Sequence, residues 1–315
     1  MQPHDDEFSG GPACPPVLVL GFNRPETTRR VLASLRNAKP ARVFFAVDGP
    51  RAGAANDVRR VAEVQAMADQ IDWPCETKTL FRAANLGCKL AVSQAISWFF
   101  ADVEAGIILE DDCVAHPTFF RFAAEMLSRY NRDERICMVS GDNFQGKRAR
   151  SEYSYYFSRY THIWGWATWR RAWQLYDHRM TRWPELRGTG WLSDMFGDPT
   201  AVDYWRRIFD ETHDDRNSSW AYRWTFSAWA HGGLTILPNA NLVSNIGFGA
   251  AATHTLIPYR ARAALPVQPM EFPLRHPPAC VREEEADAYT QLTVFTRSPW
   301  WRRLGGKIFR LLRGA

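Results

Sequence analysis

The chain lacks the cysteine patterns and the long apolar runs that define several classes of protein. Its 315 residues include only six cysteines, and none of them stands in a CxxC or other metal-ligand spacing. This usage predicts free thiols in a reducing compartment. No apolar run approaches the ~20 residues that span a bilayer, and the acidic, Gly/Pro-rich start carries no signal-peptide pattern. We therefore expect a cytoplasmic protein.

The common glycine-rich nucleotide motifs are also missing. The first apolar segment is followed by GFNRPETT instead of the GxGxxG of a dinucleotide site. Neither a GxxxxGK[ST] phosphate loop nor a GxSxG nucleophile elbow occurs anywhere in the chain. If this protein binds a diphosphate, metal and side chains are therefore expected to hold it.

The net positive charge of the chain lies entirely in its last 18 residues. The net charge is +5, and residues 298–315 alone supply five cations and no acid. The rest of the chain is balanced, so the composition does not indicate a nucleic-acid-binding body. The tail mixes these cations with Trp300, Trp301 and several aliphatic residues, a composition typical of an interfacial helix on anionic lipid. A solvated basic tail is the alternative.

Between residues 17 and 145, apolar segments alternate with amphipathic ones. Alternation of this kind predicts a mostly parallel sheet with helices on both faces. The expected strands lie in PVLVLGF, RVFFAVDGP, CETKTLF, AGIILEDD and ICMVSGDNF. After residue 150 the chain becomes rich in aromatics, and Trp166, Trp169 and Trp173 have the spacing of one helical face.

We interpret the second half as completing one domain. The expected organisation is a disordered lead-in over 1–16, one α/β domain over 17–260 with halves at 17–145 and 150–260, an extension over 261–297, and the basic tail over 298–315.

Polar residues follow the ends of four expected strands. They are Arg24, Asp48, Asn85 and the acidic run Glu110, Asp111 and Asp112. Ligands of open α/β sheets bind beyond the carboxyl ends of the strands, so these side chains are expected to share one site. Adjacent carboxylates after a buried strand suit a hard cation such as Mg²⁺ or Mn²⁺. Alternatively, two of these acids face solvent and Asp112 caps the next helix.

These segments resemble a known family in their order along the chain. VLVLGFNRPETTRRVLASL, VFFAVDGPR, NLGCKLAVSQAI and GIILEDDCVAHPTFFRF look like the nucleotide-binding half of a GT-A fold glycosyltransferase, and EDD resembles its DxD metal motif. The resemblance is closest to bacterial hemolytic-protein-like, family 2-like members, which HIWGWATWRRAW and NLVSNIGFGAAATHT also match. It extends more distantly to the Golgi N-acetylglucosaminyltransferase I. The implied fold is a Rossmann-like αβα sandwich with an aromatic-rich acceptor-side C-terminal half.

The resemblance implies a role for each matching residue. Asp112 would bind Mn²⁺ or Mg²⁺ directly, and His254 would be a late ligand to metal or phosphate. The nucleotide-sugar-binding residues would be Arg24, Asp48, Asn85, Lys89, Glu110 and Asp111. Among them, Asp48 would accept from a uracil base and Asp111 would face ribose or sugar.

Plainer interpretations stay open for several of these residues. Asp48 suits the DGP turn, Lys89 suits a solvated helix face, and His254 suits a hydrogen-bonded loop. The general base is unassigned, because the position that is acidic in many relatives is Ala221 here. Asp214 and Asp215 are the substitutes expected to be catalytic, and Glu211 is a further one.

The expected activity is metal-dependent transfer of a hexosyl or N-acetylhexosaminyl group from a UDP-sugar to a glycan or lipid-linked acceptor in cell-surface polysaccharide synthesis. A tail bound to anionic lipid would place the enzyme peripherally on the inner face of the plasma membrane. The alternative is an inactive protein that binds a nucleotide sugar or glycan. A Mg²⁺-dependent phosphotransferase is disfavoured, because LGFNRPE offers no phosphate-accepting nucleophile.

Overall fold

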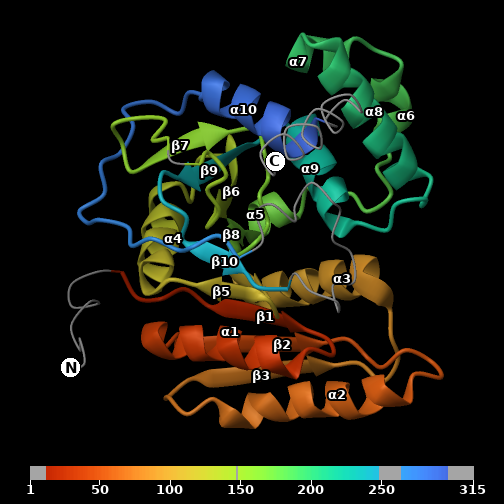
Figure 1. Ribbon diagram of the computed structural model, residues 1–315, viewed down its shortest axis with the longest axis vertical. Helices are drawn as coiled ribbons and strands as arrows, with labels where there is room; N and C mark the ends of the chain where they lie inside the picture. Colours follow the sequence, from red (N-terminus) through yellow and green to blue (C-terminus); the bar gives the residue numbers. More distant parts are fainter. Residues whose placement is uncertain (1–11, 147, 248–263, 297–315) are drawn as a thin grey trace, which may run out of the picture.

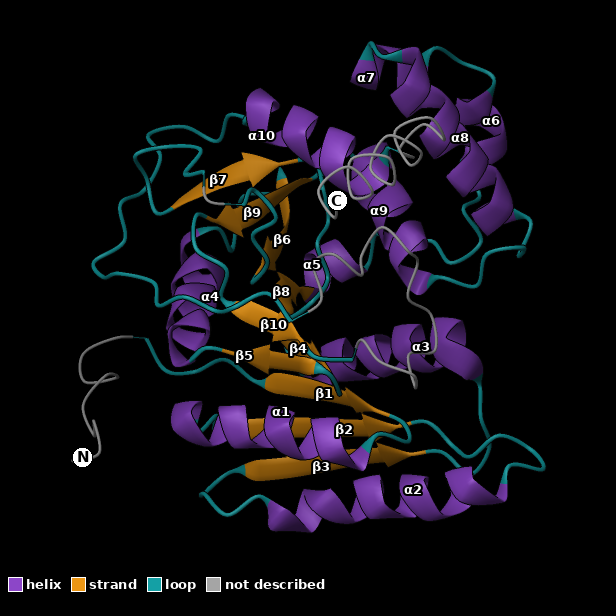
Figure 2. Ribbon diagram, in the orientation of Figure 1, coloured by secondary structure: helices purple, strands orange, loops and turns teal. Residues whose placement is uncertain are grey.

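The computed structural model describes residues 12–146, 148–247 and 264–296. Within them the chain forms an eight-stranded mixed sheet in the order β3-β2-β1-β4-β8-β6-β9-β7 and a two-stranded sheet of β10 and β5 (Figures 1 and 2). The strands are β1 Val17–Gly21, β2 Arg42–Val47, β3 Glu76–Phe81, β4 Ala105–Glu110, β5 Cys113–Ala115, β6 Ile136–Ser140, β7 Tyr155–Ser158, β8 Trp166–Trp169, β9 Leu234–Pro238 and β10 Val243–Asn245.

Most strand pairs of the large sheet are parallel. The ladders β1–β2, β2–β3, β1–β4 and β6–β9 run parallel, whereas β8 runs antiparallel to both of its neighbours, β4 and β6. The β1–β4 half is the predicted parallel arrangement. The position of β8 between β4 and β6 was not predicted, and it brings the segment before β8 to the carboxyl edge of both strands.

Helices cover both faces of this sheet, as predicted. Their bounds are α1 Pro25–Ala38, α2 Ala55–Gln65, α3 Gly87–Asp102, α4 Pro117–Arg129, α5 Arg170–Trp173, α6 Trp183–Arg187, α7 Trp191–Phe196, α8 Pro199–His213, α9 Trp220–Ala230 and α10 Glu284–Thr290. A 3₁₀ turn follows α2 at Ala66–Gln70, and a π-helical turn follows α10 at Gln291–Phe295. None of the helices in the described ranges is both long and apolar enough to span a bilayer.

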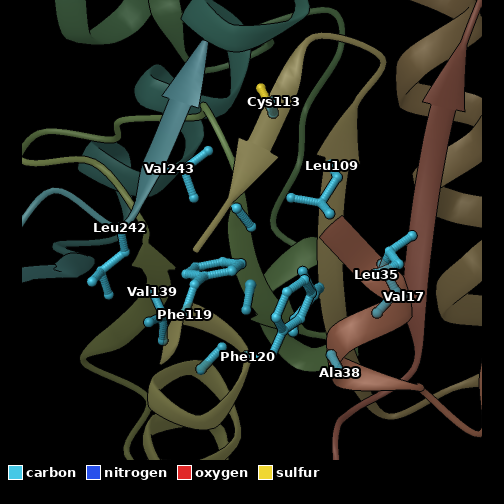
Figure 3. Close-up of a cluster of buried hydrophobic side chains, with 14 of the residues drawn as sticks. Val17, Leu35, Ala38, Leu109, Cys113, Phe119, Phe120, Val139, Leu242 and Val243 are labelled. Atoms are coloured by element: carbon cyan, nitrogen blue, oxygen red, sulfur yellow. The ribbon is translucent and has the colours of Figure 1, made fainter. Parts of the chain in front are cut away.

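Successive side chains of each strand point to opposite faces of the sheet, and each face is covered by its own set of helices. Val17 and Val19 pack with α1, α2 and α4, whereas Leu18 and Leu20 pack with α3, α8 and α9. Figure 3 shows the first cluster, in which Phe119 of α4 lies near Val139 and Leu242. Because successive side chains of these strands are buried on opposite faces, the predicted all-apolar runs are explained.

The helical interpretation of Trp166, Trp169 and Trp173 was wrong. Trp166–Trp169 is strand β8, and its first and last tryptophans are buried in opposite core clusters. Only Trp173 lies on a helix, the short α5. The physical reason is that β4 and β6 each offer an edge to this segment, and backbone pairing on both sides outweighs a local helical spacing.

Residues 264–270 contact the β10 region and α4, and residues 275–296 pack against the far edge of the large sheet. Arg282 bridges to Phe157 of β7, and the buried Asp287 accepts from Ser158 Oγ at 2.5 Å. The extension therefore covers β7. The boundary at residue 260 stays a prediction, and both His254 and the tail at 298–315 lie outside the described residues.

Candidate active site

A cavity of about 760 Å³ lies at the carboxyl ends of the central strands. Its volume is within the range of small-molecule sites. Six of the predicted site residues line it together: Arg24, Asp48, Asn85, Glu110, Asp111 and Asp112. The sequence expectation that these strand ends share one place is met by the geometry.

The acidic run is paired with one arginine. Arg24 Nη1 lies 2.5 Å from Asp112 Oδ2 and 3.4 Å from Asp111 Oδ1. Asp111 Oδ2 also accepts from the backbone N–H of Phe22 at 3.2 Å. Glu110 Oε1 is buried and has no hydrogen-bond partner in the described part of the chain. The cluster thus holds three carboxyl groups and one guanidinium group.

Burial and mutual repulsion change the proton affinity of this cluster. Burial first, and then the charges of Asp112 and Asp111, raise the pKa of Glu110 to about 8. Burial raises the pKa of Asp111 to about 7, although Arg24 opposes that rise. These groups bind protons more tightly than free carboxylates do, so a cation entering here competes with protons.

The residues present fit a hard divalent cation, although no complete protein cage is formed. In the described ranges no three His, Cys, Asp or Glu side chains are arranged to hold a metal ion. Mg²⁺ commonly binds through one or two carboxylates and fills its other positions with water and substrate phosphates. The oxygen donors of Asp111 and Asp112, beside the unpaired buried oxygen of Glu110, suit that mode of binding.

A segment from late in the chain covers Asp112. Asn245 Nδ2 donates to Asp112 Oδ1 at 3.2 Å, and the N–H of Ile246 donates to the Asp112 carbonyl at 2.8 Å. A Cβ on Gly247 would lie 2.0 Å from Asp112 Oδ2. Glycine is therefore required at position 247 for this close approach to the acid.

Asp48 holds the loop that follows β3. Its carboxylate accepts from the backbone N–H groups of Gly49, Leu86 and Gly87 and from Asn85 Nδ2, at 2.9 to 3.2 Å. Four donors match the roughly four lone-pair positions of a carboxylate. Asp48 therefore fixes the loop that carries Asn85 and Gly87 into the cavity wall.

Three other predicted residues lie away from the cavity lining. Lys89 Nζ pairs with Asp215 Oδ1 at 2.6 Å, and Arg223 Nη2 contacts the same oxygen at 2.6 Å. Asp214 is exposed and pairs with His213 and Arg216. Glu211 does line the cavity, but its carboxylate is paired with Arg207 at 3.1 Å.

Sequence reasoning missed one acid of the cavity wall, Asp142. It follows β6 by two residues, is 1% exposed and lines the cavity. The signal was present in ICMVSGDNF, where an acid follows a buried strand as Asp48 and Glu110 do. Trp164, Trp220 and Tyr222 add aromatic surface to the same wall.

Comparisons with known proteins find solved structures with low similarity to this chain. No protein-family model and no curated protein matches it. Among solved structures, it is similar to a mannosyltransferase from Pyrobaculum calidifontis in complex with GDP-Man and Mn²⁺, at 17% identity and a TM-score of 0.34, over 53% of this chain and 46% of that one. It thus spans about half of that enzyme's length.

Two further solved structures are similar to this chain over a larger share of its length. The inositol-1-phosphate CTP transferase from T. maritima shares 12% identity at a TM-score of 0.38, over 78% of this chain and 94% of that one. Mouse xyloside xylosyltransferase 1 shares 14% identity at a TM-score of 0.32, over 69% of this chain and 83% of that one. At these levels of similarity, function has to be argued from the site.

Proposed function

We propose that the chain is a GT-A-like glycosyltransferase that uses a divalent cation. It would move a hexosyl or N-acetylhexosaminyl group from a nucleoside-diphosphate donor, UDP-linked by the sequence resemblance, to a glycan or lipid-linked acceptor of the cell surface. The observation that carries this is the cluster of three acids, Glu110, Asp111 and Asp112, around Arg24 at the strand ends of the cavity.

The residues divide the cavity between the parts of the donor. Asp112 would hold Mn²⁺ or Mg²⁺ with Asp111 beside it, and the bound cation would neutralise charge on the leaving diphosphate. Arg24, next to both acids, is suited to a phosphate oxygen. Phe22, Asp48, Arg51 and Asn85 would form the nucleotide side of the cavity. Trp164 and Tyr222 offer flat faces to a sugar ring. His254 remains a proposed ligand.

A thermal-shift screen of nucleoside diphosphates with and without Mn²⁺ tests this proposal. At 100-fold excess over Kd, binding stabilises the native chain by about 2.7 kcal/mol, or about 4–5 °C for a domain of this size. We expect that shift for UDP with Mn²⁺ and a much smaller one for UDP alone. If the shift is equal with and without Mn²⁺, the cation is removed from the proposal. If none of the nucleotides causes a shift, the proposal is overturned.

The same screen has an expected pH dependence. The pKa of Glu110 is raised to about 8 and that of Asp111 to about 7, so both acids lose protons as pH rises through this range. The shift with Mn²⁺ is expected to grow from about pH 6 to about pH 8.5, because the cation competes with fewer protons.

A catalytically inactive protein that binds a nucleotide sugar is the second candidate. It is favoured by Ala221 and by the placement of Asp214 and Asp215 in ion pairs outside the cavity lining. It predicts the same binding with no turnover of any donor.

Peripheral membrane binding is proposed for the basic tail at 298–315. Each cation near an anionic surface contributes about 1 kcal/mol, so five of them favour attachment. We expect the full chain to float with anionic liposomes and a chain ending at residue 297 to remain in the bottom fraction. Neutral liposomes serve as the control, and equal flotation of both chains on anionic lipid would refute membrane binding by the tail.

A further inference from the structure

The proposed transfer lacks a general base, and the acids of the cavity wall can be compared for that role. Asp48 is occupied by four donors, Asp111 and Asp112 are paired with Arg24, and Glu211 is paired with Arg207. Glu110 lies within the acidic run itself. The remaining acid among the described lining residues is Asp142.

Asp142 lines the cavity, and its two carboxylate oxygens differ in their hydrogen bonding. Its Oδ2 accepts from the backbone N–H of Trp164 at 3.0 Å. Its Oδ1 is buried and has no hydrogen-bond partner in the described parts of the chain. A buried acceptor without a partner costs free energy, and a ligand hydroxyl in the cavity would satisfy it. Burial also raises the pKa of Asp142 well above its ordinary value, so the ionised carboxylate is a stronger base than an exposed one.

The sheet register sets Asp142 opposite the acidic run. Trp166 of β8 pairs with Ile108 of β4 on one side and with Ser140 of β6 on the other. Glu110 and Asp142 each follow those partners by two residues, on strands that run in the same direction. Neighbouring strands are about 4.8 Å apart, so with β8 between them β4 and β6 are about 10 Å apart at the sheet edge where both acids follow. A sugar ring fits within that span.

The turn that carries Asp142 is fixed on all sides. Ser140 Oγ donates to the His162 carbonyl at 2.7 Å and accepts from the N–H of Asp142 at 3.1 Å. The N–H of Gly141 donates to the Gly165 carbonyl and the Gly141 carbonyl accepts from the N–H of Leu242, and a Cβ on Gly141 would lie 2.3 Å from Val243. A carboxylate held this firmly is preorganised, as a catalytic group requires.

We infer that Asp142 is the general base that activates the acceptor hydroxyl. Asp142 Oδ1 takes the hydroxyl proton while the acceptor oxygen bonds to the anomeric carbon of the donor sugar. The bond from that carbon to the diphosphate oxygen breaks, and its electron pair leaves on the nucleoside diphosphate. Attack in one step from the side opposite the leaving group inverts the anomeric centre. This inference rests on the proposed sugar transfer.

Asp142→Asn tests the assignment, because the asparagine oxygen can still accept from Trp164 but cannot take a proton. The assay is hydrolysis of the nucleotide sugar selected by the thermal-shift screen, with water as acceptor. We expect a loss of about 10²–10⁴-fold with unchanged nucleotide binding in the thermal shift. The matched control is Asp203→Asn, an exposed acid of α8, which is expected to keep full turnover.

Azide separates a base from a residue that only positions the substrate. Azide is already an anion and needs no deprotonation, so molar azide is expected to restore turnover in Asp142→Asn and to yield a glycosyl azide. Full hydrolysis by this variant, or a loss that azide does not rescue, would overturn the assignment. If the wild-type chain binds nucleotide but turns over no donor, both the proposed sugar transfer and the assignment of Asp142 as its general base are rejected.

Discussion

An Asp112→Asn variant is expected to lose about 10³-fold in metal-dependent hydrolysis of a nucleotide sugar, because a loss of about 4 kcal/mol in transition-state stabilisation has that effect. The asparagine keeps the size of the side chain but removes the charge that would hold the cation. Its fold should survive, because the asparagine oxygen can still accept from Asn245 Nδ2 and the backbone hydrogen bond from Ile246 is kept. The measurement is the hydrolysis rate at saturating Mn²⁺, with circular dichroism to confirm folding.

The controls for this variant separate metal binding from general disturbance. Asp203→Asn removes an exposed carboxylate of the same kind on α8 and is expected to leave hydrolysis and melting unchanged. The Mn²⁺-dependent part of the nucleotide thermal shift is expected to vanish in Asp112→Asn alone. A fully active Asp112→Asn variant would remove the central claim of the proposed mechanism.

The sequence allowed the strand ends of the first half to be predicted because each is a local pattern. Apolar runs that end in Asp48 or in Glu110 mark strands whose carboxyl ends meet in a parallel sheet, and the structure brings both residues to one cavity. Alternating burial in two core clusters then explains why those runs have no polar face. No knowledge of distant contacts was needed.

The remainder of the site depends on pairing between distant segments. The insertion of β8 between β4 and β6 joins residues about 60 and 30 positions apart, and local spacing suggested a helix instead. Only that insertion places Trp164 beside Asp142. Likewise, Asn245 and Gly247 meet Asp112 across more than 130 positions. Such contacts follow from tertiary packing, which a single sequence does not encode in any short pattern.

Asp48→Ala is expected to destabilise the fold by about 3 kcal/mol, since it leaves the partly buried donors of Asn85, Leu86 and Gly87 and the buried N–H of Gly49 without an acceptor. The backbone N–H groups of Leu86 and Gly87 lose the carboxylate that orders the loop after β3. For a domain of this size the melting temperature should fall by roughly 4–6 °C. The measurement is thermal melting with and without nucleotide, beside the exposed-acid control Asp69→Ala.

The outcome distinguishes two roles for Asp48. If its carboxylate recognises a base directly, the variant should melt near the wild-type temperature and lose the preference for UDP over other nucleoside diphosphates. If it holds the loop, as its four donors indicate, melting falls first and affinity for every nucleoside diphosphate weakens together. We expect the second result, because a carboxylate whose acceptor positions are filled by backbone and Asn85 donors has little capacity left for a ligand. A selective loss of UDP binding at unchanged stability would contradict this role and restore direct base recognition.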